Sequence, residues 1–202
     1  MTTHAFAKVG GFRLRPTMPE IGPIYPTVVT TGCEKFDRFA KTVNLSGDGK
    51  DVWIFDVDDT LLSFLPYCKI HGFGIQVLKS KGFRNWGMQG KVPALQASLS
   101  LYNQLRQLGF TIILLTGRPE YLRNMTNTNL HYAGYTNWER LILREPFDEG
   151  ISALEYKSGR RKQLEDEGYR IHGCSGDQWS DLLGYPMARR TFKLPNPMYY
   201  AP

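Results

Sequence analysis

Acidic side chains follow directly on a short apolar run near residue 55. Val52 to Phe55 have the β-branched and aromatic composition of a buried strand, and Asp56, Asp58 and Asp59 come immediately after them. An apolar core does not accept unpartnered carboxylates, so we expect these acids to emerge where the strand ends. Two carboxylates at this spacing supply the hard oxygen ligands of a divalent cation and can support chemistry beside it.

A lysine, a Thr-Gly-Arg sequence and two further acids extend this set of candidate residues. The Thr-Gly-Arg sequence, residues 116–118, directly follows a second apolar run. Asp177 and Asp181 follow a later run, and Lys157 stands isolated before it. A calcium-binding loop is excluded, because that loop needs a glycine where Leu61 stands and a helix in front of it. A lone Asp-x-Asp pair is a weak signal, so only the whole set of residues indicates a functional site.

The order of the predicted elements indicates how these residues meet. Apolar residues spaced by three and four predict a helix over residues 93–109, which lies between strands at 52–55 and 110–115. A strand, a helix and a strand in succession form a parallel unit with a right-handed crossover, so polar strand ends fall on one edge of the sheet. Thr116 should therefore face Asp56. We predict an α/β fold, a Rossmann-like parallel sheet with helices on both faces.

Further elements continue this pattern toward the C-terminus. Two more helices are expected, one beginning at Pro119 and running toward Gly134 and one over residues 160–167, where Gly168 ends it. The remaining predicted strands are at residues 141–143, 169–172 and 190–194.

The N-terminal part and one internal segment depart from the pattern. Residues 1–31 are rich in glycine and proline and are read as an irregular leader, followed by a helix over 33–43. This gives a leader and first helix at 1–43 and one domain at 44–202. Residues 63–92 combine glycines with aromatics and are read as a small insert with one short helix near 75–79. The insert is either a core-packing loop or a cap over the site.

The composition indicates one globular domain without a membrane span. The chain has 202 residues, of which 42% are hydrophobic and 22% charged, enough for one full core. No run approaches about 18 apolar residues, and the beginning of the chain lacks the apolar middle region of a secretory signal. The chain as written is therefore expected in the cytoplasm. Its three cysteines show neither zinc-site nor disulfide-framework spacing and are read as free or packed thiols.

The net charge of +6 suits an anionic partner such as a phosphorylated small molecule. The basic residues are scattered, with only small clusters at 160–162 and 189–190, so the charge does not favour nucleic acid. Binding to nucleic acid stays a separate hypothesis, which a gel-shift experiment at moderate salt would test.

Several longer motifs in this chain resemble those of the haloacid dehalogenase superfamily of phosphotransferases. They are more closely similar to the plant acid phosphatase and vegetative storage protein family, which is class B-like. The motifs span residues 55–63, 65–74, 108–121, 133–144, 156–184 and 190–200. The resemblance covers about residues 44–202 and implies the haloacid dehalogenase fold with a small insert after the first motif strand. Similar proteins are secreted or vacuolar, but the leader does not resemble theirs, so the compartment stays open.

The resemblance implies an acid phosphatase that hydrolyses small phosphomonoesters with Mg²⁺ through an aspartyl-phosphate intermediate. Asp56 is the implied nucleophile, and Asp58 the implied donor and acceptor of the proton. Mg²⁺ is then bound by Asp56, the main-chain carbonyl of Asp58 and Asp177, with Asp181 anchoring its water shell.

The resemblance also assigns the residues around the phosphoryl group. Thr116 and Lys157 are implied to hold the phosphoryl oxygens, as catalytic and substrate-binding residues, with Gly117 in the turn beside them. Thr60 is expected to support the loop, and Asp59 to be structural or solvent-facing. For Arg118 two interpretations stay open, a salt bridge at the entry of the next helix and a contact with substrate.

A storage protein with vestigial phosphatase activity is the main alternative, although a chain freed from catalysis has no reason to retain Asp56. Phosphohistidine and dinuclear-metal phosphatases are excluded, because no histidine stands in an Arg-His-Gly context and no histidine-rich metal motif is present. His172 is read as a packed histidine. The natural substrate stays open, and so does the assembly, for which a homodimer is one option.

Overall fold

A single parallel sheet forms the centre of the computed structural model, which describes residues 38–201. Its five strands follow the order β3-β2-β1-β4-β5, and each neighbouring pair is parallel. The strands are β1 (Asp51–Phe55), β2 (Thr111–Pro119), β3 (Arg140–Arg144), β4 (Arg170–Gly176) and β5 (Arg190–Lys193). The predicted parallel α/β fold is confirmed.

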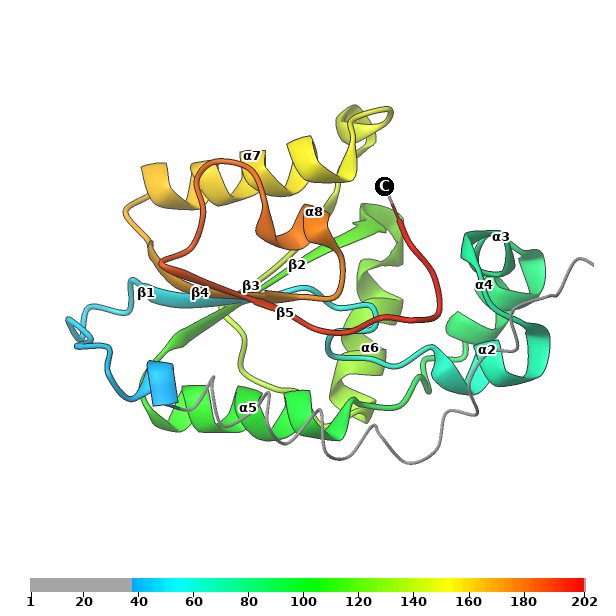
Figure 1. The fold of residues 1–202 in the computed structure, drawn as a ribbon, viewed down its shortest axis with the longest axis horizontal. Coiled ribbons are helices and arrows are strands. Elements are labelled where there is room, and N and C mark those ends of the chain that lie inside the picture. The colour runs from blue at the N-terminus through cyan, green and yellow to red at the C-terminus, as the bar shows by residue number, and fades with distance from the viewer. Residues whose placement is uncertain (1–37, 202) are drawn as a thin grey trace, which may run out of the picture.

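Helices cover both faces of this sheet (Figure 1). One core layer contains side chains of α5 and α6, and the opposite layer contains side chains of α7 and α8. These helices are α5 (Gln96–Gln107), α6 (Arg123–Tyr132), α7 (Ala153–Asp166) and α8 (Trp179–Leu182). Short 3₁₀ turns precede α6 and α7, at η1 (Glu120–Leu122) and η2 (Pro146–Asp148). A strand covered on both faces reads as a continuous apolar run, which explains the sequence of β1.

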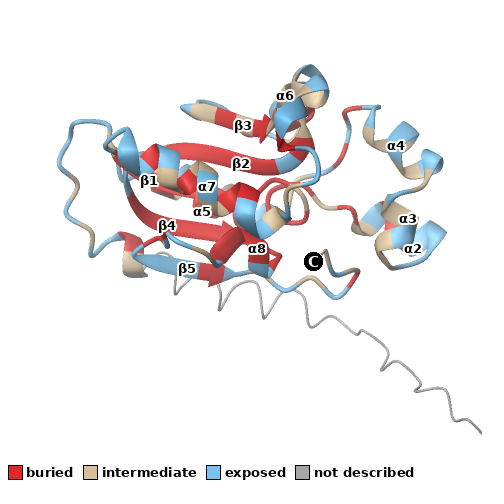
Figure 2. Ribbon diagram, turned by 90° about the horizontal axis from the view of Figure 1, so that it is seen from above, coloured by how far each residue is buried: buried red, intermediate tan, exposed pale blue. Residues whose placement is uncertain are grey.

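The central strand β1 is hydrogen-bonded on both sides, and Figure 2 shows it buried along its length. Phe55 lies opposite Leu114 on β2 and Ser175 on β4. Trp53 packs so closely over Gly173 that a Cβ on that residue would overlap the indole ring. The indole Nε1 also donates a hydrogen bond of 2.9 Å to Ser175 Oγ. The chain segments that follow β1, β2 and β4 therefore reach the same edge of the sheet.

Three elements are longer than predicted. β2 continues through the Thr-Gly-Arg sequence to Pro119, and β4 continues through Gly173 to Gly176. α7 begins at Ala153 rather than at residue 160, because Ser152 caps it by accepting a hydrogen bond of 3.1 Å from the main-chain N–H of Glu155. The predicted helix left out Gly159, but helices tolerate single glycines at modest cost. Lys157 therefore lies on a helix.

The segment after β1 contains three helices where one was predicted. They are α2 (Leu65–His71), α3 (Ile75–Leu78) and α4 (Lys81–Gly87). The proline of α2 stands in its first turn, where a missing N–H costs nothing. Gly72 and Gly74 adopt φ values of 98° and 108° in the connection to α3, and Ser80 caps α4. These breakers separate short helices instead of excluding them.

Aromatic side chains hold this segment together. The ring centroids of Phe64 and Phe83 are 4.7 Å apart, and those of Tyr67 and Trp86 are 5.3 Å apart. Most of its aromatics thus serve packing, while Phe73 is exposed. The three helices lie beyond the carboxyl ends of the strands (Figures 1 and 2). The insert limits of 63–92 and the domain division near residue 44 stay predictions.

Most of the predicted N-terminal leader and first helix lies outside the described residues. The leader at residues 1–31 lies outside the described residues, as does Cys33, and of the helix predicted at 33–43 the described residues 38–40 are helical. Cys68 and Cys174 are buried free thiols. Within residues 38–201, no helix combines the length and apolar character needed to cross a membrane.

Asp51, buried at the start of β1, is the centre of a polar cluster at the opposite edge of the sheet. Its carboxylate accepts hydrogen bonds from the main-chain N–H and hydroxyl of Ser46, at 2.6 and 2.7 Å, and from Arg170 Nε at 2.8 Å. His172 Nε2 lies 2.7 Å from the same carboxylate. His172 is thus a packed residue, as the sequence indicated.

We expect Asp51→Asn to lower the free energy of unfolding by about 2 kcal/mol at pH 7, because a buried, charge-assisted network loses its acceptor. The hydrogen bond from Arg170 holds the pKa of Asp51 below its ordinary value, although burial opposes it. The stabilisation is therefore complete above the unfolded-state pKa of about 3.9 and is lost as the pH falls through the folded-state pKa. Urea denaturation at pH 7 and pH 3 measures both effects.

Asp48→Asn is the matched control for this prediction, because Asp48 also pairs with Arg170 but is exposed. At pH 7, Asp48→Asn should lower the free energy of unfolding by less than Asp51→Asn does. Equal losses in the two variants, or an Asp51→Asn effect of the same size at pH 3, would contradict the prediction.

Candidate active site

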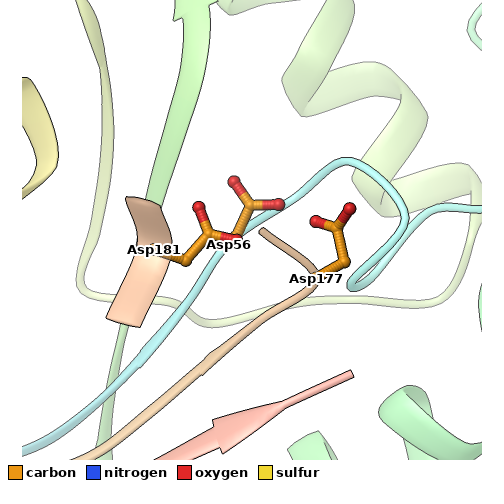
Figure 3. A group of neighbouring side chains, drawn as sticks. All are labelled: Asp56, Asp177 and Asp181. Carbon is orange, nitrogen blue, oxygen red and sulfur yellow. The ribbon is translucent and has the colours of Figure 1, made fainter. Parts of the chain in front are cut away.

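Three buried carboxylates meet at the carboxyl edge of the sheet. Asp56 follows β1, Asp177 follows β4, and Asp181 lies on α8. Each offers an oxygen, and these oxygens lie within 4.8 Å of one another. Figure 3 shows the three side chains directed toward a common region. The predicted convergence of acids from separate strand ends is therefore present in the fold.

Lys157 reaches this group from α7. Its Nζ lies 2.6 Å from Asp56 Oδ1 and also donates to Asp181 Oδ1. Burial by itself lowers the pKa of Lys157, but the carboxylates of Asp56 and Asp181 outweigh it and raise the pKa above its ordinary value. The lysine therefore stays positively charged inside the site.

The hydrogen bonds leave specific carboxylate oxygens open. Both oxygens of Asp181 are used, because Lys157 donates to Oδ1 and the main-chain N–H of Gln178 donates to Oδ2 at 2.8 Å. Among the described residues, none donates a hydrogen bond to Asp56 Oδ2. Within residues 38–201, the hydroxyl of Thr60 is the one donor to Asp177 Oδ1, at 3.3 Å. Asp56 and Asp177 thus keep free ligand positions, whereas Asp181 is committed to holding the group together.

The charge balance of this group fits a divalent cation. Burial raises the pKa of Asp56 well above its ordinary value, Lys157 opposes this effect, and the neighbouring acids add to it. Burial and Asp181 likewise raise the pKa of Asp177. One lysine does not balance three buried carboxylates, so a bound cation would relieve their repulsion. The available donors are carboxylate oxygens, which suit a hard cation.

Asp58 is held by Arg118 across the edge of the sheet. Arg118 Nε lies 3.0 and 3.1 Å from the two oxygens of Asp58, and Nη2 lies 2.6 Å from Oδ1. The remaining Nη1 donates to Thr126 on α6 at 3.1 Å. Of the two interpretations of Arg118, the structure shows a salt bridge, but its partner is Asp58. The planar guanidinium fixes the orientation of this carboxylate.

The other predicted residues lie on β2 and in the loop after β1. Thr116 is fully buried on β2, at a register position next to that of Asp56, and its Oγ1 accepts a hydrogen bond of 3.1 Å from the main-chain N–H of Arg118. Gly117, beside it, is exposed. The hydroxyl of Thr60 joins the loop after β1 to Asp177, which agrees with a supporting position.

Asp59 is a buried structural residue and does not face solvent. It adopts a left-handed backbone conformation with φ of 53°. Its two carboxylate oxygens accept hydrogen bonds of 2.8 Å, from the main-chain N–H of Phe64 and from the hydroxyl of Tyr199. Burial raises the pKa of Asp59 to about 7. The carboxylate thus connects the turn after β1 to the start of the insert and to the C-terminal segment.

Three residues near the acids were not predicted to belong to the site. Gln178 and Asn196 donate side-chain hydrogen bonds of 2.6 and 2.7 Å to Asp177 Oδ2, and Tyr199 binds Asp59. Asn196 and Tyr199 lie in residues 190–200, a motif that contributes to the family resemblance but by itself indicates no role. No local pattern in the sequence indicates which acid an isolated amide or phenol will reach.

Comparisons with known proteins agree on one family. The model of HAD superfamily, subfamily IIIB (Acid phosphatase), matches residues 25–202. Acid phosphatase 1 of Solanum lycopersicum is 51% identical over 180 residues, which cover 89% of this chain and 71% of that protein. Vegetative storage protein 2 of Arabidopsis thaliana is 41% identical over 173 residues, which cover 85% of this chain and 64% of that protein.

The fold also matches a solved structure. The crystal structure of the Class C acid phosphatase from Bacillus anthracis with tungstate bound superposes with a TM-score of 0.64 at 21% identity. The match covers 92% of this chain and 81% of that one. At this level of identity the likeness establishes the shared fold.

Proposed function

The chain belongs to the subfamily IIIB acid phosphatases of the HAD superfamily and is a phosphomonoester hydrolase; from this premise we propose that it cleaves small phosphomonoesters through an aspartyl-phosphate on Asp56, with Mg²⁺ as cofactor. One observation supports this proposal most strongly. The carboxylate of Asp56 is buried, has Lys157 on one oxygen and has no described hydrogen-bond donor on the other.

The carboxylate of Asp56 is the proposed nucleophile. A phosphomonoester dianion repels a carboxylate, so attack requires neutralising charge and a fixed approach. The positive charge of Lys157 lies beside Asp56 and suits the binding of a phosphoryl oxygen. One carboxylate oxygen of Asp56 would form a bond to phosphorus while the bond from phosphorus to the ester oxygen breaks, and the other oxygen would stay available to the cation. Water then cleaves the aspartyl-phosphate, which releases inorganic phosphate and regenerates Asp56.

Asp58 is the proposed proton donor and acceptor. It would protonate the departing ester oxygen in the first step and accept a proton from the attacking water in the second. Its bidentate pairing with Arg118 keeps the carboxylate in one orientation. Arg118 is therefore a positioning residue in this scheme.

The cofactor and phosphoryl contacts complete the proposal. Asp56, the main-chain carbonyl of Asp58 and Asp177 would hold Mg²⁺, with Asp181 anchoring the group. When bound, the cation supplies positive charge that offsets the charge on the phosphoryl oxygens. Thr116, Gly117 and Lys157 would hold those oxygens.

The test is phosphate release from two esters that differ in leaving group. Wild-type protein with Mg²⁺ should hydrolyse both 4-nitrophenyl phosphate and glycerol phosphate between pH 4 and 7. Asp58→Asn should lower kcat for glycerol phosphate by about 10²-fold or more, because an alkoxide needs a proton to leave. The loss for the nitrophenyl ester should be smaller, since nitrophenolate leaves readily. Initial rates of phosphate release measure both.

If the wild-type protein releases phosphate from neither ester, the proposed function is wrong. Equal losses for both esters in Asp58→Asn would contradict the role of Asp58 alone. Asp48→Asn, which removes an exposed carboxylate at the opposite edge of the sheet, serves as the control and should retain wild-type rates.

A storage role with weak turnover is the second candidate. The observation that favours it is the 41% identity to a protein named vegetative storage protein 2. The retained carboxylate of Asp56, with its partner Lys157, favours catalysis instead. High abundance in storage tissue together with negligible phosphate release would support the storage role.

A further inference from the structure

The C-terminal segment at residues 194–201, here called the strap, passes along the carboxyl edge of the sheet. It leaves β5, and the main-chain N–H of Leu194 donates to the carbonyl of Gly176 at 2.8 Å. In Figures 1 and 2 the strap runs near α8 and toward the insert helices. It therefore lies beside the loops that carry the acids.

Asn196, which lies in the strap, directs its side-chain amide toward Asp177. Its Oδ1 accepts a hydrogen bond of 2.9 Å from the main-chain N–H of Met198, an Asx-turn that fixes which end of the carboxamide points outward. Its Nδ2 consequently donates to Asp177 Oδ2, at 2.7 Å. Gln178 Nε2 donates to the same oxygen at 2.6 Å. Two neutral donors on Oδ2 leave Oδ1 as the oxygen of Asp177 with a free ligand position.

The strap also fixes the second of these donors and the neighbouring loop. The main-chain N–H of Ala201 donates to Gln178 Oε1 at 3.0 Å, so the Gln178 carboxamide is held between the strap and Asp177. Tyr199 donates to Asp59 Oδ2 at 2.8 Å. The strap therefore contacts both acid-bearing loops, the one after β1 and the one after β4.

A further contact joins the strap to the insert. The main-chain N–H of Gly74 donates to the carbonyl of Met198 at 2.9 Å. The Met198 side chain is buried in the same core layer as Phe64. The strap is thus anchored on both sides of the site, which gives Asn196 a fixed base from which to orient Asp177.

We propose that the strap is a positioning element of the cation site, in which Asn196 sets the carboxylate of Asp177 for Mg²⁺. This inference rests on the proposed function. In this role Asn196 acts through Asp177, so its loss should change the affinity for Mg²⁺ rather than the chemical step. Hydrogen-bond partners of metal-ligating carboxylates typically change metal affinity by about 10- to 100-fold.

The decisive variant is Asn196→Ser. A serine hydroxyl can still accept the N–H of Met198 and preserve the turn, but it is too short to reach Asp177. We expect Mg²⁺ affinity to fall by about 10-fold or more, measured by calorimetric titration of Mg²⁺ into the protein without substrate. The Mg²⁺ concentration for half-maximal phosphatase activity should rise by the same factor, while kcat at saturating Mg²⁺ stays within about threefold of wild type.

The matched control is Tyr200→Phe, because Tyr200 lies in the strap with its side chain exposed. It should bind Mg²⁺ as the wild type does. Asn196→Ala is the second variant, and unfolding in EDTA shows whether either variant is destabilised independently of Mg²⁺. Unchanged Mg²⁺ affinity in a folded Asn196 variant would overturn the role of the strap. Wild-type protein that neither binds Mg²⁺ nor releases phosphate would overturn the proposed function instead.

Discussion

Asp56→Asn should lower kcat for 4-nitrophenyl phosphate by at least about 10⁴-fold, the scale expected when a nucleophile is removed from an enzyme. The carboxamide preserves the shape of the side chain, and its oxygen can still accept from Lys157. It cannot attack phosphorus, because it lacks the negative charge of the carboxylate. The measurement is the initial rate of phosphate release at saturating Mg²⁺.

A trapped complex provides the structural counterpart of this experiment. A wild-type structure with Mg²⁺ and fluoroberyllate should show beryllium bonded to a carboxylate oxygen of Asp56, and Asp56→Asn should show no such bond. An Asp56→Asn protein with more than about a tenth of wild-type activity would rule out this residue as the nucleophile, since so small a loss matches a minor contact.

Removal of divalent cations should abolish phosphate release, with a loss of about 10³-fold or more that added Mg²⁺ restores. The physical reason is the excess negative charge of Asp56, Asp177 and Asp181, which Lys157 alone does not balance. Dialysis against EDTA followed by titration with Mg²⁺ gives the activity as a function of free cation.

The same titration has a readout that does not depend on activity. A cation that binds only the folded chain stabilises it by about 2.7 kcal/mol at a concentration of 100 times Kd. The thermal midpoint of wild-type protein should therefore rise with Mg²⁺. The rise should be smaller in Asp177→Asn, which removes a proposed ligand. Full activity after exhaustive chelation would contradict a cation requirement.

The sequence predicted the fold correctly where one pattern of apolar residues extended over a whole strand or helix. The run Val52–Phe55 and the helix between β1 and β2 both gave clear patterns, and their succession predicted the parallel sheet. The insert was harder to predict, because its proline and its glycines suggest an irregular chain. In the structure they separate three short helices, each only one to two turns long. Local patterns carry little information at that length.

The candidate site likewise contains residues whose positions the sequence predicts and others whose positions it does not. Acids at strand ends could be brought together by topology alone, so the meeting of Asp56, Asp177 and Asp181 followed from the predicted sheet. The partners of Asp58 and Asp177 could not be found in this way. The sequence left Arg118 open between a salt bridge at the entry of the next helix and a contact with substrate, and Asn196 reaches Asp177 from a segment without regular structure. Such contacts depend on side-chain orientation in three dimensions, which no spacing rule encodes.

The position of β1 between β2 and β4 has a consequence for synthesis of the chain on the ribosome. β1 is made early and β2 can pair with one side of it, but β4 begins about 120 residues after β1, a delay on the order of ten seconds at ~5–20 residues per second. During that interval the other edge of an apolar strand lacks its partner, a state prone to pairing with foreign strands. We therefore expect the second edge of β1 to stay exposed in the nascent chain until β4 emerges, and the acids can meet only after residues 170–181 have been made.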